Sequence, residues 1–298
     1  MKHNLKIVAV LLGMFLITQL IGLYVVNHYS NDENKLPFGM DSPKIENNAD
    51  FYKIFPSIIV AFVIAVVLLF LLNKFDAAFV LRMWFFIVVI IALSISFNSI
   101  LSKLNYSIIM SVIVALPLAF IKIYRRDFLV HNLTELFIYP GIAAVFVPIL
   151  NVGTVILLLI LISIYDMWAV WRSGIMQKMA KYQIEKLNVF GGFFIPYASK
   201  KLKMKIRKMK KSERKMKKGV KVNLAILGGG DVIFPIIASG VFLVRYGLAP
   251  ALFVTLGALL GLSYLFFFSK KEKFYPAMPF ISAGIFLGMI ASWFLFIR

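Results

Sequence analysis

Long apolar stretches dominate this chain and restrict it to folds that a lipid bilayer can surround. Hydrophobic residues occupy 61% of the 298 positions, and the mean hydropathy is +0.88. A soluble domain is nearer half apolar, so much of this surface must face lipid. A helix needs about 20 apolar residues to cross the hydrocarbon core of a membrane. Nine stretches approach that length, which predicts an all-α membrane protein with nine transmembrane helices.

A long polar segment separates the sixth expected helix from the seventh. The approximate limits of the nine spans are 7–26, 56–72, 77–97, 106–123, 129–150, 152–171, 220–244, 248–268 and 276–297. We therefore divide the chain into residues 1–172 with six helices, a basic cytoplasmic loop at 173–219, and residues 220–298 with three helices. No small-residue cleavage site follows the first span, so we expect it to be retained.

Positive charge in the loops orients the predicted helices. Lys and Arg favour the cytoplasmic side of a membrane. Segment 172–221 carries 17 of them against Glu185 and Glu213, which is +15 of the chain's net +20. This predicts a cytoplasmic N-terminus and, after nine helices, a C-terminus outside, in a multi-pass protein of the plasma membrane. The charge indicates topology, so we expect no nucleic acid partner.

The basic run at 200–218 alternates cations with apolar residues. Such a pattern predicts an amphipathic helix on the anionic lipids of the cytoplasmic leaflet. A solvated topology anchor that binds nothing specific explains the same pattern.

The chain could also form a homo-oligomer.

Metal and thiol chemistry have little support in the sequence. There is no cysteine, and the three histidines, His3, His28 and His131, are far apart in the chain. Zinc hydrolases need closely spaced ligands, such as two histidines one helical turn apart. We therefore expect no metal site and no cofactor.

Three acidic residues lie inside apolar spans: Glu135, Asp166 and Asp231. A carboxylate at the bilayer centre costs roughly 2.5–3.5 kcal/mol even on the most lenient scale. Glu135 is near Arg125 and Arg126 at the start of the fifth span, where a helix dipole favours an acid. We interpret it as an interfacial residue, and we single out the two aspartates as candidate functional groups.

The two aspartates are expected at similar depth on consecutive antiparallel helices. Asp166 precedes Arg172 by six residues, or about 9 Å of helix, and Asp231 follows Lys221 by ten, or about 15 Å. Two facing carboxyl groups share a proton, so one can take a proton from water while the other donates to a carbonyl. The pair titrates as a unit, and this arrangement suits aspartyl proteolysis.

The acids alone leave other functions open. A proton-coupled transporter or channel also uses buried acids, and a protein that binds transmembrane helices without cutting them could contain them. Their surroundings favour a hydrolase. Gly228, Gly229 and Gly230 precede Asp231 and can loosen a helix where water is needed. Pro276 and Pro279 keep the start of the ninth span irregular.

Three motifs in order resemble those of presenilins and signal peptide peptidases, which are intramembrane aspartyl proteases. Tyr165-Asp166 resembles the Tyr-Asp motif of their sixth helix, and Gly228-Gly229-Gly230-Asp231 fits the Gly-x-Gly-Asp motif of their seventh. Pro276-Ala277-Met278 resembles their Pro-Ala-Leu motif in the ninth. The expected orientation is similar to that of presenilin, and the small size is similar to that of an archaeal member.

The resemblance implies an endopeptidase that cuts transmembrane segments, with type I single-span proteins as expected substrates. It implies that Asp166 and Asp231 are catalytic, and that the other residues of the three motifs shape the active site. Two positions depart from the usual pattern, because Gly229 is commonly larger and Met278 is commonly Leu. We also expect an unwound substrate to pair as a strand near Pro276 or the start of the seventh helix.

Overall fold

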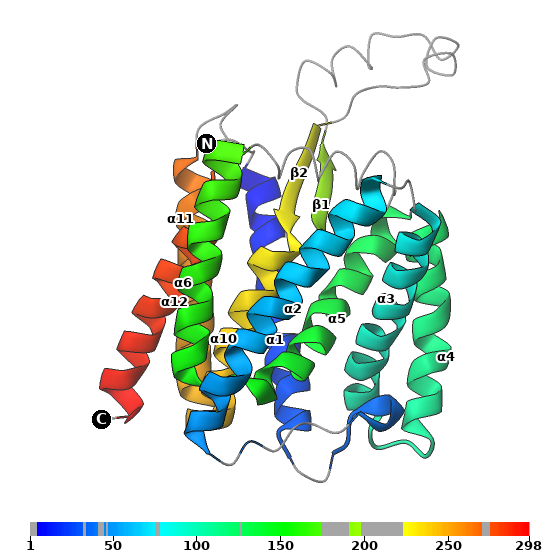
Figure 1. The fold of residues 1–298 in the computed structure, drawn as a ribbon, viewed down its shortest axis with the longest axis horizontal. Coiled ribbons are helices and arrows are strands. Elements are labelled where there is room, and N and C mark those ends of the chain that lie inside the picture. The colour runs from blue at the N-terminus through cyan, green and yellow to red at the C-terminus, as the bar shows by residue number, and fades with distance from the viewer. Residues whose placement is uncertain are drawn as a thin grey trace.

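Apolar helices make up most of the chain that is described in the computed structural model (Figure 1). The structure describes residues 5–31, 34–40, 45, 47–74, 78–125, 127–173, 191–197, 223–269 and 275–297. Most of the predicted basic loop, including the run at 200–218, lies outside these residues.

Each α-helix of the described chain overlaps one of the predicted spans. The helices are α1 (Leu5–Tyr29), α2 (Asn48–Lys74), α3 (Ala78–Leu101), α4 (Ser107–Phe120), α5 (Phe128–Phe146), α6 (Val152–Trp168), α10 (Gly229–Tyr246), α11 (Leu248–Phe268) and α12 (Met278–Ser292). Short 3-10 or π segments extend four of them: η2 (Ile121–Arg125), η3 (Val147–Ile149), η4 (Ala169–Ser173) and η6 (Trp293–Ile297). Within the described ranges, 8 helices are long and apolar enough to cross a membrane.

The prediction of an all-α fold is wrong for two segments, one within the predicted basic loop and one at the start of the predicted seventh helix. Strands β1 (Gly192–Tyr197) and β2 (Asn223–Gly228) pair antiparallel, from Gly192 opposite Gly228 to Tyr197 opposite Asn223. The seventh helix therefore begins at Gly229 and not near residue 220. The depth calculated for Asp231 is wrong for the same reason, because a strand rises about 3.3 Å per residue against 1.5 Å in a helix.

The hairpin forms where the apolar pattern is too short to distinguish a strand from a helix. In β2 the exposed fraction alternates, at 0% for Ala225, 41% for Ile226 and 2% for Leu227. That period of two is the pattern of a strand with one buried face. The glycines at 228–230 also disfavour extending the helix backwards.

The helices surround the hairpin and α10, which lie toward the middle of the bundle (Figure 1). α1, α5, α6, α11 and α12 share one apolar cluster with α10 and both strands. A second cluster joins α3, α4 and α5. α5 belongs to both clusters, so it connects the outer helices to the centre.

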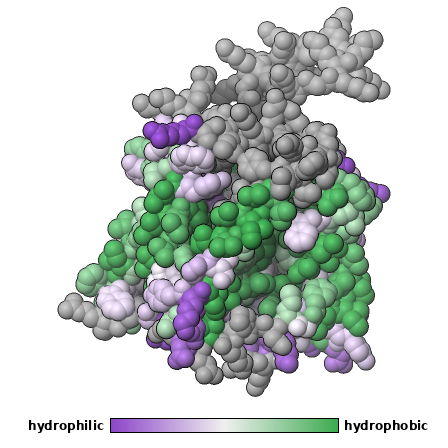
Figure 2. Space-filling view, viewed as in Figure 1, coloured by the Kyte–Doolittle hydropathy of each residue, from purple (hydrophilic) through white to green (hydrophobic). Residues whose placement is uncertain are grey.

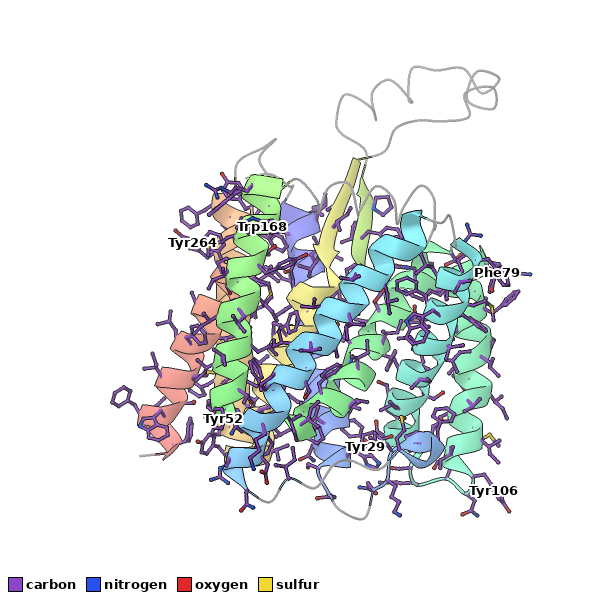
Figure 3. The ribbon with its side chains drawn as sticks, viewed as in Figure 1. Tyr29, Tyr52, Phe79, Tyr106, Trp168 and Tyr264 are labelled. Carbon is purple, nitrogen blue, oxygen red and sulfur yellow. The ribbon has the colours of Figure 1, made fainter. Side chains whose placement is uncertain are left out.

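The surface has the distribution that a membrane protein requires. Figure 2 shows apolar side chains across the middle of one face and hydrophilic ones toward its two ends. Exposed aromatic side chains gather near the ends, with Phe79, Trp168 and Tyr264 at the end that carries the hairpin and Tyr52 and Tyr106 at the other (Figure 3). Aromatic residues concentrate at membrane–water interfaces, which fits an integral membrane protein.

Glycine allows α11 and α12 to touch through their backbones. A Cβ on Gly284 would lie 2.1 Å from the carbonyl oxygen of Gly257, and one on Gly257 would lie 2.2 Å from that of Gly284. Small residues permit such close approach in membranes, where packing replaces the hydrophobic effect between helices. The contact fixes α12, whose first residue is Met278.

We predict that Gly284→Ala lowers the free energy of unfolding by about 2 kcal/mol, because the added methyl group must displace backbone. Gly13→Ala is the matched control, since a Cβ there meets nothing within 4 Å and alanine is the better helix former. Denaturant titration in detergent micelles measures both. Equal stability of the two variants would contradict the contact.

Candidate active site

Asp166 lies near the hairpin end of α6 and is 7% exposed. Its carboxylate oxygen Oδ2 accepts a hydrogen bond of 3.0 Å from the backbone N–H of Met278, and the backbone of Ala277 donates as well. Met278 is the first residue of α12, and the first N–H groups of a helix have no acceptor within the helix. Asp166 therefore caps α12 from a neighbouring helix and links the Tyr-Asp motif to the Pro-Ala-Met motif.

Asp231 lies in the first turn of α10 and is half-buried. β2 ends at Gly228, whose backbone is extended with φ −62° and ψ 148°, and the helix begins at the next residue. The Gly228 backbone donates a hydrogen bond to the Asp231 carboxylate. The strand-to-helix turn thus holds the acid at the point where the hairpin enters the bundle.

The two carboxylates interact electrostatically across the interface between α6 and α10. α10 contacts α6 and α12, so the elements that carry all three sequence motifs meet here. Two acids in one low-dielectric site cannot both ionise easily, and they share a proton. Such a pair can act on water and on a carbonyl oxygen together.

The other predicted site residues lie at different distances from this pair. Pro276 and Met278 are buried and Ala277 is half-buried beside Asp166. Gly228 contacts Asp231, and Gly230 is exposed. Tyr165 is 44% exposed and its ring centroid lies 6.3 Å from that of Trp168, on the outward side of α6.

Tyr139 on α5 is a neighbour of the site that sequence reasoning missed. A Cβ on Gly229 would lie 2.8 Å from the Tyr139 hydroxyl oxygen. The ring is 5% exposed and packs edge-on against Phe193 at 5.9 Å. Tyr139 therefore occupies the space that a side chain at position 229 would need, which accounts for a glycine at this position. A tyrosine within an apolar span gave no signal for this contact.

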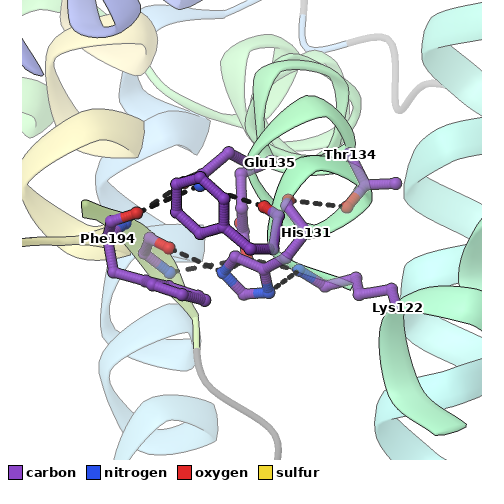
Figure 4. Close-up of polar contacts among 8 residues, drawn as sticks. Lys122, His131, Thr134, Glu135 and Phe194 are labelled. Atoms are coloured by element: carbon purple, nitrogen blue, oxygen red, sulfur yellow. Dashed lines mark hydrogen bonds and ion pairs between the residues drawn. The ribbon is translucent and has the colours of Figure 1, made fainter. Parts of the chain in front are cut away.

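The prediction that Glu135 is an interfacial acid near Arg125 and Arg126 is wrong. It is 2% exposed, and its Oε1 lies 2.5 Å from Nζ of Lys122, itself 6% exposed. His131 completes the group, with Nδ1 3.2 Å from Lys122 Nζ and Nε2 2.9 Å from the Gly192 carbonyl oxygen (Figure 4). The spacing of His131 and Glu135, four residues apart on one helical face, was the available signal.

Comparison with known proteins identifies a family. The sequence profile described as "Signal-peptide peptidase, presenilin aspartyl protease" matches residues 12–297. No curated protein sequence matches the chain significantly. Two crystal forms of a presenilin family intramembrane aspartate protease superpose with a TM-score of 0.61 each. The first is 20% identical in sequence, and the match covers 97% of this chain and 99% of that one. The second is 21% identical, and the match covers 96% of each chain.

We predict that Gly229→Ala destabilises the protein by about 1–2 kcal/mol, because Tyr139 is packed and cannot yield freely. Gly230→Ala is the matched control, since its nearest contact, with Phe234, would be an ordinary 3.6 Å. Tyr139→Leu should relieve the clash, giving a coupling of at least about 0.5 kcal/mol with Gly229→Ala. Additive effects in this double-mutant cycle would show that the two residues do not compete for space.

Proposed function

The chain belongs to the signal-peptide peptidase and presenilin family of aspartyl proteases, and we propose that Asp166 and Asp231 are the carboxylates with which it cuts peptide bonds inside the membrane. The observation that carries this assignment is the electrostatic interaction between the two acids, of which Asp166 is held by backbone donors at the start of α12 and Asp231 by the backbone at the end of β2. Of the three acids that lie within apolar spans, only Glu135 has a cation as its ion-pair partner among the described residues.

The chemistry follows from a shared proton. The ionised carboxylate takes a proton from water as the water oxygen attacks the carbonyl carbon, and the protonated carboxylate gives its proton to the carbonyl oxygen. The tetrahedral diol then collapses. The C–N bond breaks, the nitrogen takes a proton, and the products leave as a new carboxyl terminus and a new amino terminus. No cofactor is needed at any step.

The hydrogen bond from Met278 to Asp166 supplies positioning. A carboxylate that accepts a backbone N–H keeps one oxygen occupied and presents the other. The backbone hydrogen bond from Gly228 positions the Asp231 carboxylate in the same way. Preorganised donors of this kind cost no rearrangement during the reaction.

We propose that the substrate binds as an extended strand along β2. A transmembrane helix hides its carbonyl groups in hydrogen bonds, so it must unwind before water can attack. Backbone groups of an antiparallel strand point alternately to its two edges. The backbone polar groups of Gly192 and Phe194 in β1 point toward α5. The backbone polar groups of their partners, Gly228 and Ile226, therefore point to the edge of β2 away from β1. A strand added there would run directly to Asp231.

The proposed substrates are single-span proteins of type I orientation in the cell membrane. With the N-terminus in the cytoplasm, the hairpin end of the bundle faces the cytoplasm, and cleavage falls in that half of the membrane. The basic run at 200–218 would then meet anionic lipids.

We predict that Asp166→Asn and Asp231→Asn each lower turnover of a single-span test substrate at least about 100-fold, because each removes one half of the acid–base pair. Asp50→Asn is the control, an exposed acid paired with Lys53. Product formation is followed by gel and mass spectrometry, and folding by thermal melting. Either aspartate variant with wild-type turnover would refute the assignment.

We predict that Met278→Pro lowers kcat at least about tenfold, because proline removes the N–H that Asp166 accepts. Proline is tolerated at the first position of a helix, so α12 should still form. Met278→Leu is the matched control, since it keeps the N–H and nearly the same volume. If both variants turn over equally fast, the hydrogen bond does not contribute to catalysis.

A further inference from the structure

The cluster formed by Lys122, His131 and Glu135 is buried, charged and outside the proposed catalytic pair (Figure 4). Taking such charges out of water is costly, and replacing a buried ion pair with apolar residues is often neutral or stabilising. Fold stability alone therefore does not account for it. What the cluster holds is the backbone of β1.

Hydrogen bonds define the protonation pattern of the cluster. His131 Nε2 lies 2.9 Å from the Gly192 carbonyl, so this nitrogen carries the proton and donates. Nδ1 is then an acceptor, which matches the ammonium of Lys122 at 3.2 Å. Lys122 donates to Glu135 too. One positive and one negative charge therefore surround a neutral imidazole.

Gly192 receives both of its outward backbone contacts from this cluster. Its carbonyl accepts from His131, and its N–H lies 3.4 Å from Oε1 of Glu135. Its φ of 143° is in the region that only glycine adopts readily. Asn132 holds the next outward residue, accepting from the Phe194 N–H at 3.1 Å and donating to its carbonyl at 3.0 Å. Side chains of α5 thus take the place of a third strand along the first three residues of β1.

The pairing of β1 with β2 connects the fixed position of Gly192 to the proposed active site. Gly192 lies directly opposite Gly228 in the register of the sheet. Gly228 donates to the Asp231 carboxylate and ends β2 where α10 begins. The path from the cluster to the acid therefore passes through one pair of opposed residues.

We infer that Lys122, His131 and Glu135 are positioning residues for Asp231. By fixing both polar groups of Gly192, they set where Gly228 lies and so where the Asp231 carboxylate is presented to Asp166. They touch neither substrate nor water in the reaction. This inference rests on the proposed function of Asp231, and its test has a readout that does not.

Two double variants separate the effect of the hydrogen bond to Gly192 from the effect of the ion pair. Lys122→Met/Glu135→Gln removes both charges but keeps a side-chain oxygen that can accept from the Gly192 N–H. Lys122→Met/Glu135→Met removes the same charges and the acceptor, with almost the same side-chain length. The two proteins differ only at position 135, and neither contains an unpaired buried charge. For His131, His131→Gln keeps a donor amide and His131→Leu does not.

The first measurement is amide hydrogen exchange of the segment 223–231 in wild type and in both double variants. We expect exchange to rise at least tenfold in Lys122→Met/Glu135→Met and less than threefold in Lys122→Met/Glu135→Gln. Equal exchange in the two variants would overturn the inference, whether or not the protein cleaves a substrate. Absence of cleavage by the wild type would instead refute the proposed function.

The second measurement is turnover per active site, counted by titration with a tight transition-state-analogue inhibitor. We expect the Met-containing pair to keep its full number of sites and its KM within twofold, while kcat falls at least tenfold relative to the Gln-containing pair. A merely structural role would reduce the number of sites and leave kcat per site unchanged. That result would overturn the inference.

Discussion

Backbone polar groups at membrane depth need partners, and this requirement governs the structure. Helices satisfy it internally, but an open strand edge or an irregular segment does not. The chain has both, in the hairpin and at residues 275–277, and side chains from neighbouring helices supply the missing partners. Asn132 and His131 bond to β1, and Asp166 caps α12.

Satisfying the backbone in this way also assembles the proposed active site. Asp166 accepts from the start of α12, and Asp231 accepts from the end of β2. Asp166 therefore binds the irregular start of a helix, and Asp231 binds the end of a strand. The glycines of α11 and α12 let the capped helix pack closely, so Met278 stays beside Asp166.

Sequence reasoning predicted the helices well because a span of apolar residues has a length fixed by the bilayer. It also singled out Asp166 and Asp231, since carboxylates are costly in lipid. It failed at β2, where the short apolar run Leu224–Leu227 fits a strand or a helix equally well. It misjudged Glu135 because Lys122, thirteen residues away, is its partner through a tertiary contact. Tyr139 was missed since only the fold brings it to Gly229.

We propose that two aspartates, one from α6 and one from α10, hydrolyse a peptide bond within the membrane. The most direct measurement reconstitutes the purified protein in liposomes with a type I single-span substrate, in water enriched in oxygen-18, and maps the products by mass spectrometry. We predict a cut within the span, in its cytoplasmic half. One heavy oxygen should enter the new carboxyl terminus, and a transition-state-analogue inhibitor should block the reaction. Cleavage only outside the span, or no cleavage, would contradict it.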